Sequence, residues 1–420
     1  MAFFIPKFCK LPIKVLVIFC TILLSGGSIR AYDNLPPLLS GADCEPSTHK
    51  WEERALARST VRQLGLPSML HPEDNSPSEV KIQLGRKLFF DRRLSINKTM
   101  SCAMCHVPEQ AFTNWEMQTS VGVEGRSVKR NAPSLINVGF LKFLFHDGRD
   151  KLLETQFVGP LTARNEMSNP SVGMVIELLR SLSDYEEYFL SAFGGHATLD
   201  RVGMALGAYQ RTLVGGGSPF DQWYFGNKEH ALTSSQKRGF RVFMDKGGCG
   251  SCHSVEKTHA LFTDNSFHDT GYGWMREQKR QNPPKNKLVQ VAPGVSYEIS
   301  NDQIMSVGEP EKADLGRYEV TEKTEDRWKF RTSSLRNIAK TGPYMHDGGL
   351  QSLAEVIEFY NRGGPGHKLQ DKRIQPLKLT NEEKTDLIQF LESLTSKNLS
   401  CLIAEARQSE PDNHESVAER

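Results

Sequence analysis

A motif of two cysteines, separated by two residues and followed directly by a histidine, occurs twice in this chain of 420 residues. The two copies are Cys102, Cys105 and His106, and Cys249, Cys252 and His253. Cysteines at this spacing can add to the two vinyl groups of one porphyrin, and the histidine that follows then ligates the iron. Zinc sites and redox dithiols also use cysteine pairs, but neither requires the adjacent histidine. The sequence therefore predicts two covalently bound haem c groups.

The N-terminus predicts export. Lysines precede an apolar run from Val15 to Leu24, and a stretch of small residues ends at Ala31. This order is typical of a secretory signal peptide, and a run of about ten residues is shorter than the roughly twenty that a membrane-spanning helix needs. We expect residues 1–31 to be cleaved before Tyr32, and we expect no transmembrane segment later in the chain. A periplasmic location follows, because bacteria attach c-type haem after export.

The remaining cysteines leave two alternatives. Cys9 and Cys20 lie in the predicted signal peptide, so that Cys44 and Cys401 are the cysteines of the mature chain outside the haem motifs. An oxidising compartment permits a disulfide between them, which would tie together the two ends of the mature chain. Two unpaired thiols are the alternative.

An internal repeat divides the chain. The segments Ser134–Asn137 and His146–Gly148 recur as Ser334–Asn337 and His346–Gly348, at a constant offset of 200 residues. The formal charge of +2 gives no bias toward nucleic acid. The length suits two haem domains. The predicted organisation is an N-terminal extension at 32–83, a first domain at 84–225, a second domain at 226–400 and a polar tail at 401–420, of which Glu405 to Arg420 is expected to be disordered.

Helices dominate the secondary structure that the sequence predicts. Apolar residues have helical spacing over Met174–Phe193 and Asp200–Leu213, and Thr233 begins a capping box before the second haem motif. The second half is longer than the first between its haem motif and its His-Asp-Gly turn. Its insertion, at about residues 275–313, is polar and contains prolines, which predicts an irregular loop. That loop is either a docking surface or a solvated insertion without a partner.

The two haem motifs, together with Arg331–Asn337 and Pro343–Gly348, resemble the bacterial di-haem cytochrome c peroxidase and MauG superfamily over roughly Leu84 to Leu394. The resemblance implies an all-α fold of two cytochrome c-like haem domains with long irregular loops. One haem would react with hydrogen peroxide and the other would pass electrons.

The resemblance also implies a calcium ion between the haems. Its ligands would be Asn131 and the backbone carbonyls of Thr341 and Pro343, which are oxygen donors suited to a hard cation. Turn residues without an ion are the alternative.

The repeat compares what each half offers as the sixth iron ligand. Tyr360 ends a predicted amphipathic helix, at the family position of the distal ligand of the second haem. Peroxidases of the family commonly have methionine there, whereas MauG resembles this chain in having tyrosine. The equivalent residue of the first half is Pro160, which has no side-chain donor atom. Typical peroxidases close the first haem with a loop histidine, but residues 107–145 contain none, and Met117 is more typical of a packing residue. We therefore expect an open first haem.

Glu166 and Gln156 are the candidate catalytic side chains beside Pro160, because MauG-like enzymes resemble this chain around them. Cleavage of peroxide needs an acid-base group and a polar donor that orients the oxygen atoms. The alternative for Glu166 is a surface residue that caps the next helix. A tyrosine-ligated haem has a low reduction potential and suits storage of oxidising equivalents. Enzymes resembling MauG use such equivalents to oxidise aromatic side chains of a partner protein, including tryptophan to kynurenine.

Two positions depart from the family pattern. His146 stands where the family usually has a tryptophan between the haems, and Lys246–Gly248 replaces a segment in which MauG has a tryptophan that passes oxidising equivalents to its substrate. His146 is either a hydrogen-bonded core histidine or a residue that approaches an iron. The route to the partner is expected to differ. His259, His268 and His367 are expected to be surface or structural histidines.

The sequence thus predicts a periplasmic enzyme that uses hydrogen peroxide to oxidise a tryptophan or tyrosine of a partner protein. One rival is a di-haem cytochrome c peroxidase that takes electrons from small redox proteins. The other is an electron-transfer cytochrome without catalysis, which requires both irons to be six-coordinate.

Overall fold

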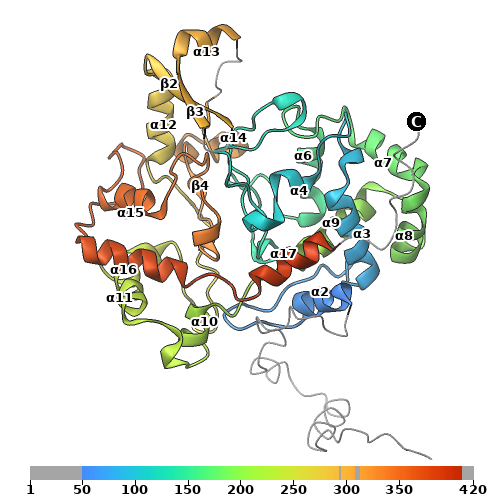
Figure 1. Cartoon of the computed structure of the whole chain (residues 1–420), viewed down its shortest axis with the longest axis horizontal. Helices are drawn as coiled ribbons and strands as arrows, with labels where there is room; N and C mark the ends of the chain where they lie inside the picture. The colour runs from blue at the N-terminus through green and yellow to red at the C-terminus, as the bar shows by residue number, and fades with distance from the viewer. Residues whose placement is uncertain (1–49, 293–294, 308–312, 409–420) are drawn as a thin grey trace, which may run out of the picture. The chain divides into compact units, whose positions relative to one another are not determined.

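Two long helices pack across each other beside the first haem motif. They are α3 (Glu79–Phe90) and α9 (Leu199–Arg211) of the computed structural model, which describes residues 50–292, 295–307 and 313–408 (Figure 1). The other α-helices as far as residue 224 are α2 Trp51–Thr60, α4 Cys102–Cys105, α5 Leu153–Gln156, α6 Val158–Thr162, α7 Val172–Ser181, α8 Ser183–Phe193 and α10 Pro219–Tyr224.

The second half repeats this arrangement with α11 (Ser234–Met244) and α16 (Asn381–Glu392), which pack beside the second haem motif. The other α-helices here are α12 Tyr272–Gln281, α13 Asn301–Val307, α14 Tyr318–Thr321, α15 Leu353–Asn361 and α17 Leu399–Arg407. Two antiparallel strand pairs join β1 (Phe267–His268) to β4 (Phe330–Arg331) and β2 (Asn286–Ala292) to β3 (Val295–Ser300).

A glycine permits the close crossing of the helices in each half. A Cβ atom added to Gly85 on α3 would lie 1.9 Å from the carbonyl oxygen of Ala205 on α9. The same atom on Gly239 of α11 would lie 2.0 Å from the carbonyl oxygen of Asp386 on α16. Any side chain would push the paired backbones apart, so the two halves share one packing solution.

Hydrogen bonds also follow the repeat. The amide of Asn137 donates to the carbonyl of Leu213 at 2.8 Å, and that of Asn337 donates to the carbonyl of Leu394 at 3.1 Å. Both asparagines have left-handed backbone angles, with φ of 66° and 60°. Each therefore ties the segment after its haem motif to the residues just beyond the second long helix of its half.

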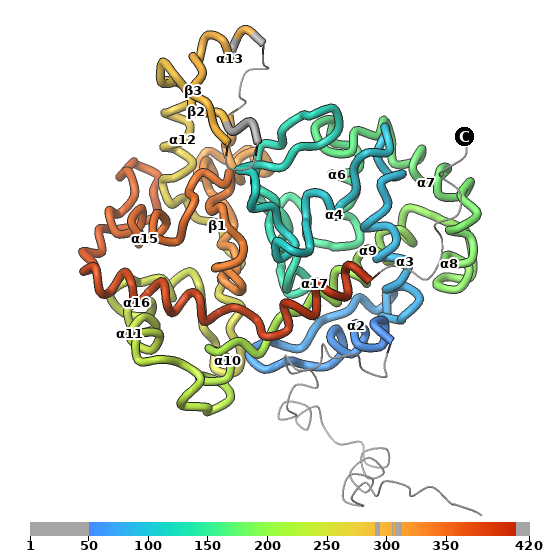
Figure 2. Tube along the Cα trace, viewed as in Figure 1, coloured from blue at the N-terminus to red at the C-terminus, as the bar shows by residue number. Residues whose placement is uncertain are grey.

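The described residues contain two hydrophobic cores, one in each half. Phe220 of α10 belongs to the second core and meets Phe390 of α16 edge-on, although residue 220 falls inside the predicted first domain. The C-terminal helix α17 crosses back to the first core, where Leu402 is 1% exposed (Figure 2). Glu405 of this helix forms an ion pair with Arg54 at 2.8 Å.

Two sequence predictions about secondary structure are wrong. The expected irregular loop at 275–313 contains most of α12, the β2–β3 ribbon and α13, so the chain is mostly rather than entirely helical. Along β3, Val295, Tyr297 and Ile299 alternate with polar residues, which is a strand pattern that the prediction of an irregular loop overlooked. The disorder expected from Glu405 onward is wrong as far as Arg407, because α17 continues to that residue and Leu402 and Ala406 are buried against the first half.

Other predictions are confirmed or lie outside the described residues. The helix expected at Asp200–Leu213 is α9, and the capping box at Thr233 is formed; the stretch Met174–Phe193 is split into α7 and α8. Cys401 is disulfide-bonded, which excludes an unpaired thiol there. Its partner is outside the described residues, as are Cys44 and the predicted signal peptide. No helix in the described part of the chain could cross a membrane.

Candidate haem sites

The two motif histidines are oriented in the same way. His106 Nδ1 lies 3.1 Å from the carbonyl oxygen of Phe112, and His253 Nδ1 lies 2.9 Å from that of Phe262. A carbonyl only accepts, so each Nδ1 carries the proton and each Nε2 is left for iron. Burial lowers the pKa of both histidines, which favours the neutral form that a metal needs.

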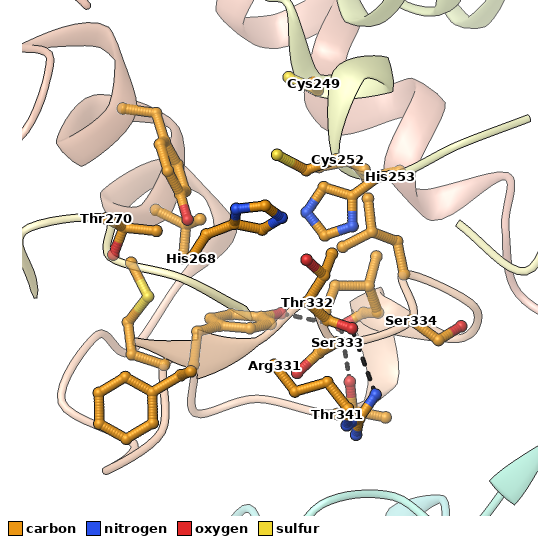
Figure 3. A pocket seen from close by; sticks show the side chains of 18 of the residues that line it. Cys249, Cys252, His253, His268, Thr270, Arg331, Thr332, Ser333, Ser334 and Thr341 are labelled. Carbon is orange, nitrogen blue, oxygen red and sulfur yellow. Dashed lines mark hydrogen bonds between the residues drawn. The ribbon is translucent and has the colours of Figure 1, made fainter. Parts of the chain in front are cut away.

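The second motif opens on a cavity of about 330 Å³ that residues of both halves line, within the usual range for a bound cofactor. Figure 3 shows Cys249, Cys252 and His253 above the segment that carries Arg331. Apolar side chains of α15 and α16 complete the wall. A planar, largely apolar group with a few polar contacts fits these surroundings.

Arg331 provides a test of whether this cavity suits haem. It is only 7% exposed, and its guanidinium donates to the carbonyls of Phe145 and Thr332, both at 3.2 Å. No carboxylate of the described residues pairs with it, and burial lowers its pKa to about 10. A buried guanidinium with only neutral acceptors favours an anion. The propionate carboxylates of haem c supply that charge, so the residues fit the cofactor.

Tyr360 lines the same cavity as His253. Its phenol bonds to the Thr270 side chain, and it lies near the thiols of Cys249 and Cys252. Burial is the main cause that raises its pKa, so the free phenol is neutral unless a cation stabilises the phenolate. Helix α15, predicted from the sequence, brings this side chain to the second haem motif.

In the first half, Pro160 lies in α6, where the repeat aligns it with Tyr360. The Met167 amide donates to the Pro160 carbonyl at 3.1 Å, which holds the adjacent Glu166 close to Pro160. Gln156 ends α5, about one turn before Pro160, and is partly buried. The sequence prediction that these three residues lie near one another is consistent with this backbone arrangement.

Glu166 is partly buried beside the first haem motif. Its pKa is raised by burial, against the opposing charge of Arg149. Its charge in turn contributes to the raised pKa of Cys105, after the larger effect of burial. The alternative in which Glu166 caps the next helix is wrong, because Ser171 accepts the capping hydrogen bond from Met174 of α7.

The three residues implied as calcium ligands all line the cavity described above. The Asn131 side-chain amide donates to the carbonyls of Asn114 and Gln118, at 3.2 and 3.1 Å, which leaves its Oδ1 as a free acceptor. Thr341 and Pro343 approach from the second half, with a cis peptide bond before Pro343. The oxygen atoms of these three residues are compatible with a calcium ion, and the calcium site stays a prediction.

His146 is partly buried and makes a hydrogen bond to the backbone. Its Nε2 lies 3.0 Å from the carbonyl oxygen of Asn131, so the ring holds the predicted calcium ligand by its backbone. Burial, followed by the charge of Arg130, lowers the pKa of His146 to about 3. The neutral ring bonds to the backbone through Nε2, and His146 also lines the cavity at the second haem motif. The alternative in which His146 approaches an iron stays a prediction.

Sequence analysis did not predict that Arg331 and His268 line the cavity, although Arg331 begins a segment that carries the family resemblance. His268 was expected to be structural or superficial, yet it lies next to His253 (Figure 3), between Asp264 at 2.8 Å and Asp371 at 3.0 Å. Only the pairing of β1 with β4 brings His268 and Arg331 together, and neither short strand has a sequence signal. Met117 is partly buried and lies outside the cavity.

Comparison with known proteins identifies the family. A family model described as di-haem cytochrome c peroxidase matches residues 79–229. The methylamine utilization protein MauG of Methylorubrum extorquens is 33% identical over 92% of this chain and 96% of its own length. The chain belongs to the di-haem cytochrome c peroxidase and MauG family. This di-haem family implies c-type haem cofactors, hydrogen peroxide as a reactant and a protein partner.

Other relatives of this di-haem enzyme carry both names. Cytochrome-c peroxidase IdrP1 of Pseudomonas sp. strain SCT is 35% identical over 79% of the chain and 84% of that protein. The crystal structure of a MauG-like protein associated with microbial copper homeostasis has a TM-score of 0.63 and 30% identity, covering 80% of this chain and 95% of that one. The similarities establish a haem-dependent oxidoreductase and leave its reducing substrate open.

Proposed function

We propose that this enzyme works in the periplasm and uses hydrogen peroxide to oxidise a tryptophan or tyrosine side chain of a partner protein. The observation that carries the proposal is the contrast between Pro160 and Tyr360 at equivalent places of the repeat. Pro160 has no side-chain donor atom, whereas Tyr360 offers a phenol that lines the cavity at the second haem motif. Each bound haem supplies the redox chemistry of its half.

Glu166 suits the proton transfer that peroxide cleavage needs. A group that takes a proton from the inner oxygen and returns it to the outer oxygen works best when its pKa is close to the working pH. The raised pKa of Glu166 moves the carboxyl in that direction. Gln156 is the candidate hydrogen-bond donor that orients peroxide, and Pro160 leaves room for it.

Tyr360 favours oxidation of a protein side chain over a conventional peroxidase cycle. A phenolate is a hard anionic ligand that lowers the reduction potential of iron. Such a site is a poor acceptor for electrons from ordinary small cytochromes. The 35% identity to IdrP1 keeps the cytochrome c peroxidase activity as the second candidate. A purely electron-transfer cytochrome is third, because Pro160 leaves it without a ligand for the first iron.

We also propose that Asn131, Thr341 and Pro343 hold one calcium ion, through the Asn131 side chain and two backbone carbonyls. Three protein oxygens leave room for several water ligands. The hydrogen bond from His146 to the Asn131 carbonyl links this site to the turn that follows in the first half.

Electron paramagnetic resonance and optical spectra of the ferric protein, before and after stoichiometric peroxide, test the main proposal. One high-spin and one low-spin haem are expected, and Tyr360→Phe should change only the low-spin signals. Tyr344→Phe is the matched control, since Tyr344 also lines the cavity but bonds to the Ile338 carbonyl at 3.1 Å. Two low-spin haems that react with peroxide only after partial reduction would return the protein to the gated peroxidases.

A further inference from the structure

A row of aromatic rings leads away from the second haem cavity. Tyr360 contacts Phe359 with ring centroids 5.3 Å apart, and Phe359 contacts Tyr272 of α12 at 5.6 Å. Tyr272 itself lines the cavity and packs edge-on against His346 at 5.7 Å. Among these rings, Tyr272 is the first oxidisable side chain beyond the expected iron ligand.

The surroundings of Tyr272 favour the loss of an electron together with the phenolic proton. It is 3% exposed, and its hydroxyl donates to Asp347 Oδ1 at 3.0 Å. The amide of Gly349 and the guanidinium of Arg276 hold Asp347 in place, at 2.9 and 2.6 Å. A buried phenol releases an electron readily only if a nearby base takes its proton, and this carboxylate is in hydrogen-bond reach. Tyr344, also on the cavity, has only a carbonyl as partner.

Trp274 is the next oxidisable side chain along α12, two residues after Tyr272, and is partly exposed. Side chains at this spacing leave the helix on different faces, so an electron that passes between them crosses the helix and not a ring contact. The Trp274 ring stacks on His367 with centroids 5.0 Å apart and planes at 4°. His367 Nε2 in turn lies 2.9 Å from Asp269 Oδ2. A carboxylate behind the stacked ring favours positive charge on the indole.

Trp328 is a second tryptophan that contacts His367, but it is a poorer electron donor. It meets His367 edge-on at 5.6 Å, and the Arg327 guanidinium lies 5.7 Å from the centre of its ring. A neighbouring cation opposes the loss of an electron from an indole. Gly273 packs tightly here, since a Cβ atom on it would lie 2.9 Å from the Phe330 ring. The backbone between Tyr272 and Trp274 is therefore fixed.

We propose that Tyr272 and Trp274 are the relay by which an external donor delivers electrons to the second haem cavity, with Asp347 accepting the proton of Tyr272. This inference rests on the proposed function for the identity of the donor. Tyr272 gives up one electron and passes its proton to Asp347. Trp274 then reduces Tyr272, which recovers the proton, and the partner's aromatic side chain reduces Trp274. Two such passages supply the two electrons that, with two protons, convert one hydrogen peroxide to two waters.

The location of Trp274 also assigns the docking surface. The partner must bring its aromatic side chain to the first turn of α12, where Trp274 is partly exposed. The segment Lys246–Gly248 before the second haem motif offers no oxidisable side chain. The relay thus gives this chain a route for electrons between the partner protein and the second haem cavity that does not use the segment Lys246–Gly248.

Peptide mass spectrometry of the di-haem protein, after peroxide and without a partner, tests the relay. Added oxygen should concentrate on Trp274, and Tyr272→Phe should reduce that modification about tenfold, equal to ~1.4 kcal/mol of barrier. Asp347→Asn should do the same, whereas Tyr344→Phe should not. Trp115, which is 53% exposed, reports oxidation that does not pass through the relay.

The outcomes separate the relay from the proposed function. A wild-type optical response to peroxide with Trp274 unmodified, or with equal modification in Tyr272→Phe, overturns the relay alone. Preferential modification of Trp328 would place the surface end of the relay at Trp328 and so overturn the assignment of Trp274. If the ferric protein does not respond to peroxide, the proposed function fails. Peptide mass spectrometry of the half-reduced protein after peroxide then tests the relay by the same criteria.

Discussion

Replacement of Glu166 by glutamine tests the acid-base role most directly. The backbone bonds of this residue, from the Val123 amide to its carbonyl and from its amide to Ala163, do not involve the side chain, so the fold should persist. A positioned acid-base group contributes about 10²–10⁴-fold to a rate. We expect the peroxide reaction of Glu166→Gln to slow by that factor, which corresponds to about 3–5 kcal/mol of barrier.

The pH dependence of the peroxide reaction is a second, independent test of the role of Glu166. The carboxylate form takes the first proton from peroxide, so the wild-type rate should rise as pH increases through the raised pKa of Glu166. The rate of the Glu166→Gln variant should not show this increase with pH. Stopped-flow absorbance of the haem measures both rates, and Glu177→Gln, at an exposed site on α7, is the control. A Glu166→Gln rate within about twofold of wild type, far less than the effect of a catalytic acid-base group, would refute the reasoning.

Three further predictions concern charge. Arg331→Gln should lower the reduction potential of the second haem, because a buried cation favours the reduced form; a redox titration that shows no shift, or a rise, contradicts the role as a haem anchor. Arg336→Met should destabilise the fold by about 3–5 kcal/mol, since it leaves the buried Asp221 without its ion-pair partner at 2.8 Å; urea unfolding checks this, and a loss below about 1 kcal/mol argues against it. Chelation with EGTA should remove one calcium ion per chain and alter the spectra of the haems, and Asn131→Ala should bind none; calcium retained by Asn131→Ala would place the ion elsewhere.

Local motifs were sufficient to predict the haem attachment residues. The cysteine spacing, the adjacent histidine and the capping box at Thr233 depend on neighbours within a few residues, and the sequence contains all of these neighbours. The constant offset of the repeat also predicted that Pro160 and Tyr360 are equivalent. The matching hydrogen bonds of Asn137 and Asn337 support that alignment in three dimensions.

Long-range contacts decided the rest of the site. Arg331 and His268 reach the cavity because two strands of two residues each pair across 60 or more positions of the sequence. The burial of Glu166, the hydrogen bond of His146 to Asn131 and the proton acceptor of Tyr272 likewise depend on segments distant in the chain. No local pattern encodes such contacts, because a side chain's neighbours across a fold leave no period in the sequence.

The sequence by itself determined the cofactor type and the duplicated plan of the chain, and it predicted the proximal ligands, since covalent attachment and helix packing need particular residues at fixed spacing. The tertiary structure decided which polar groups surround each haem motif, where α17 docks, and which aromatic residues connect the second cavity to the surface. Burial and charge exist only after distant segments meet, and they set the acid-base and redox properties of the site.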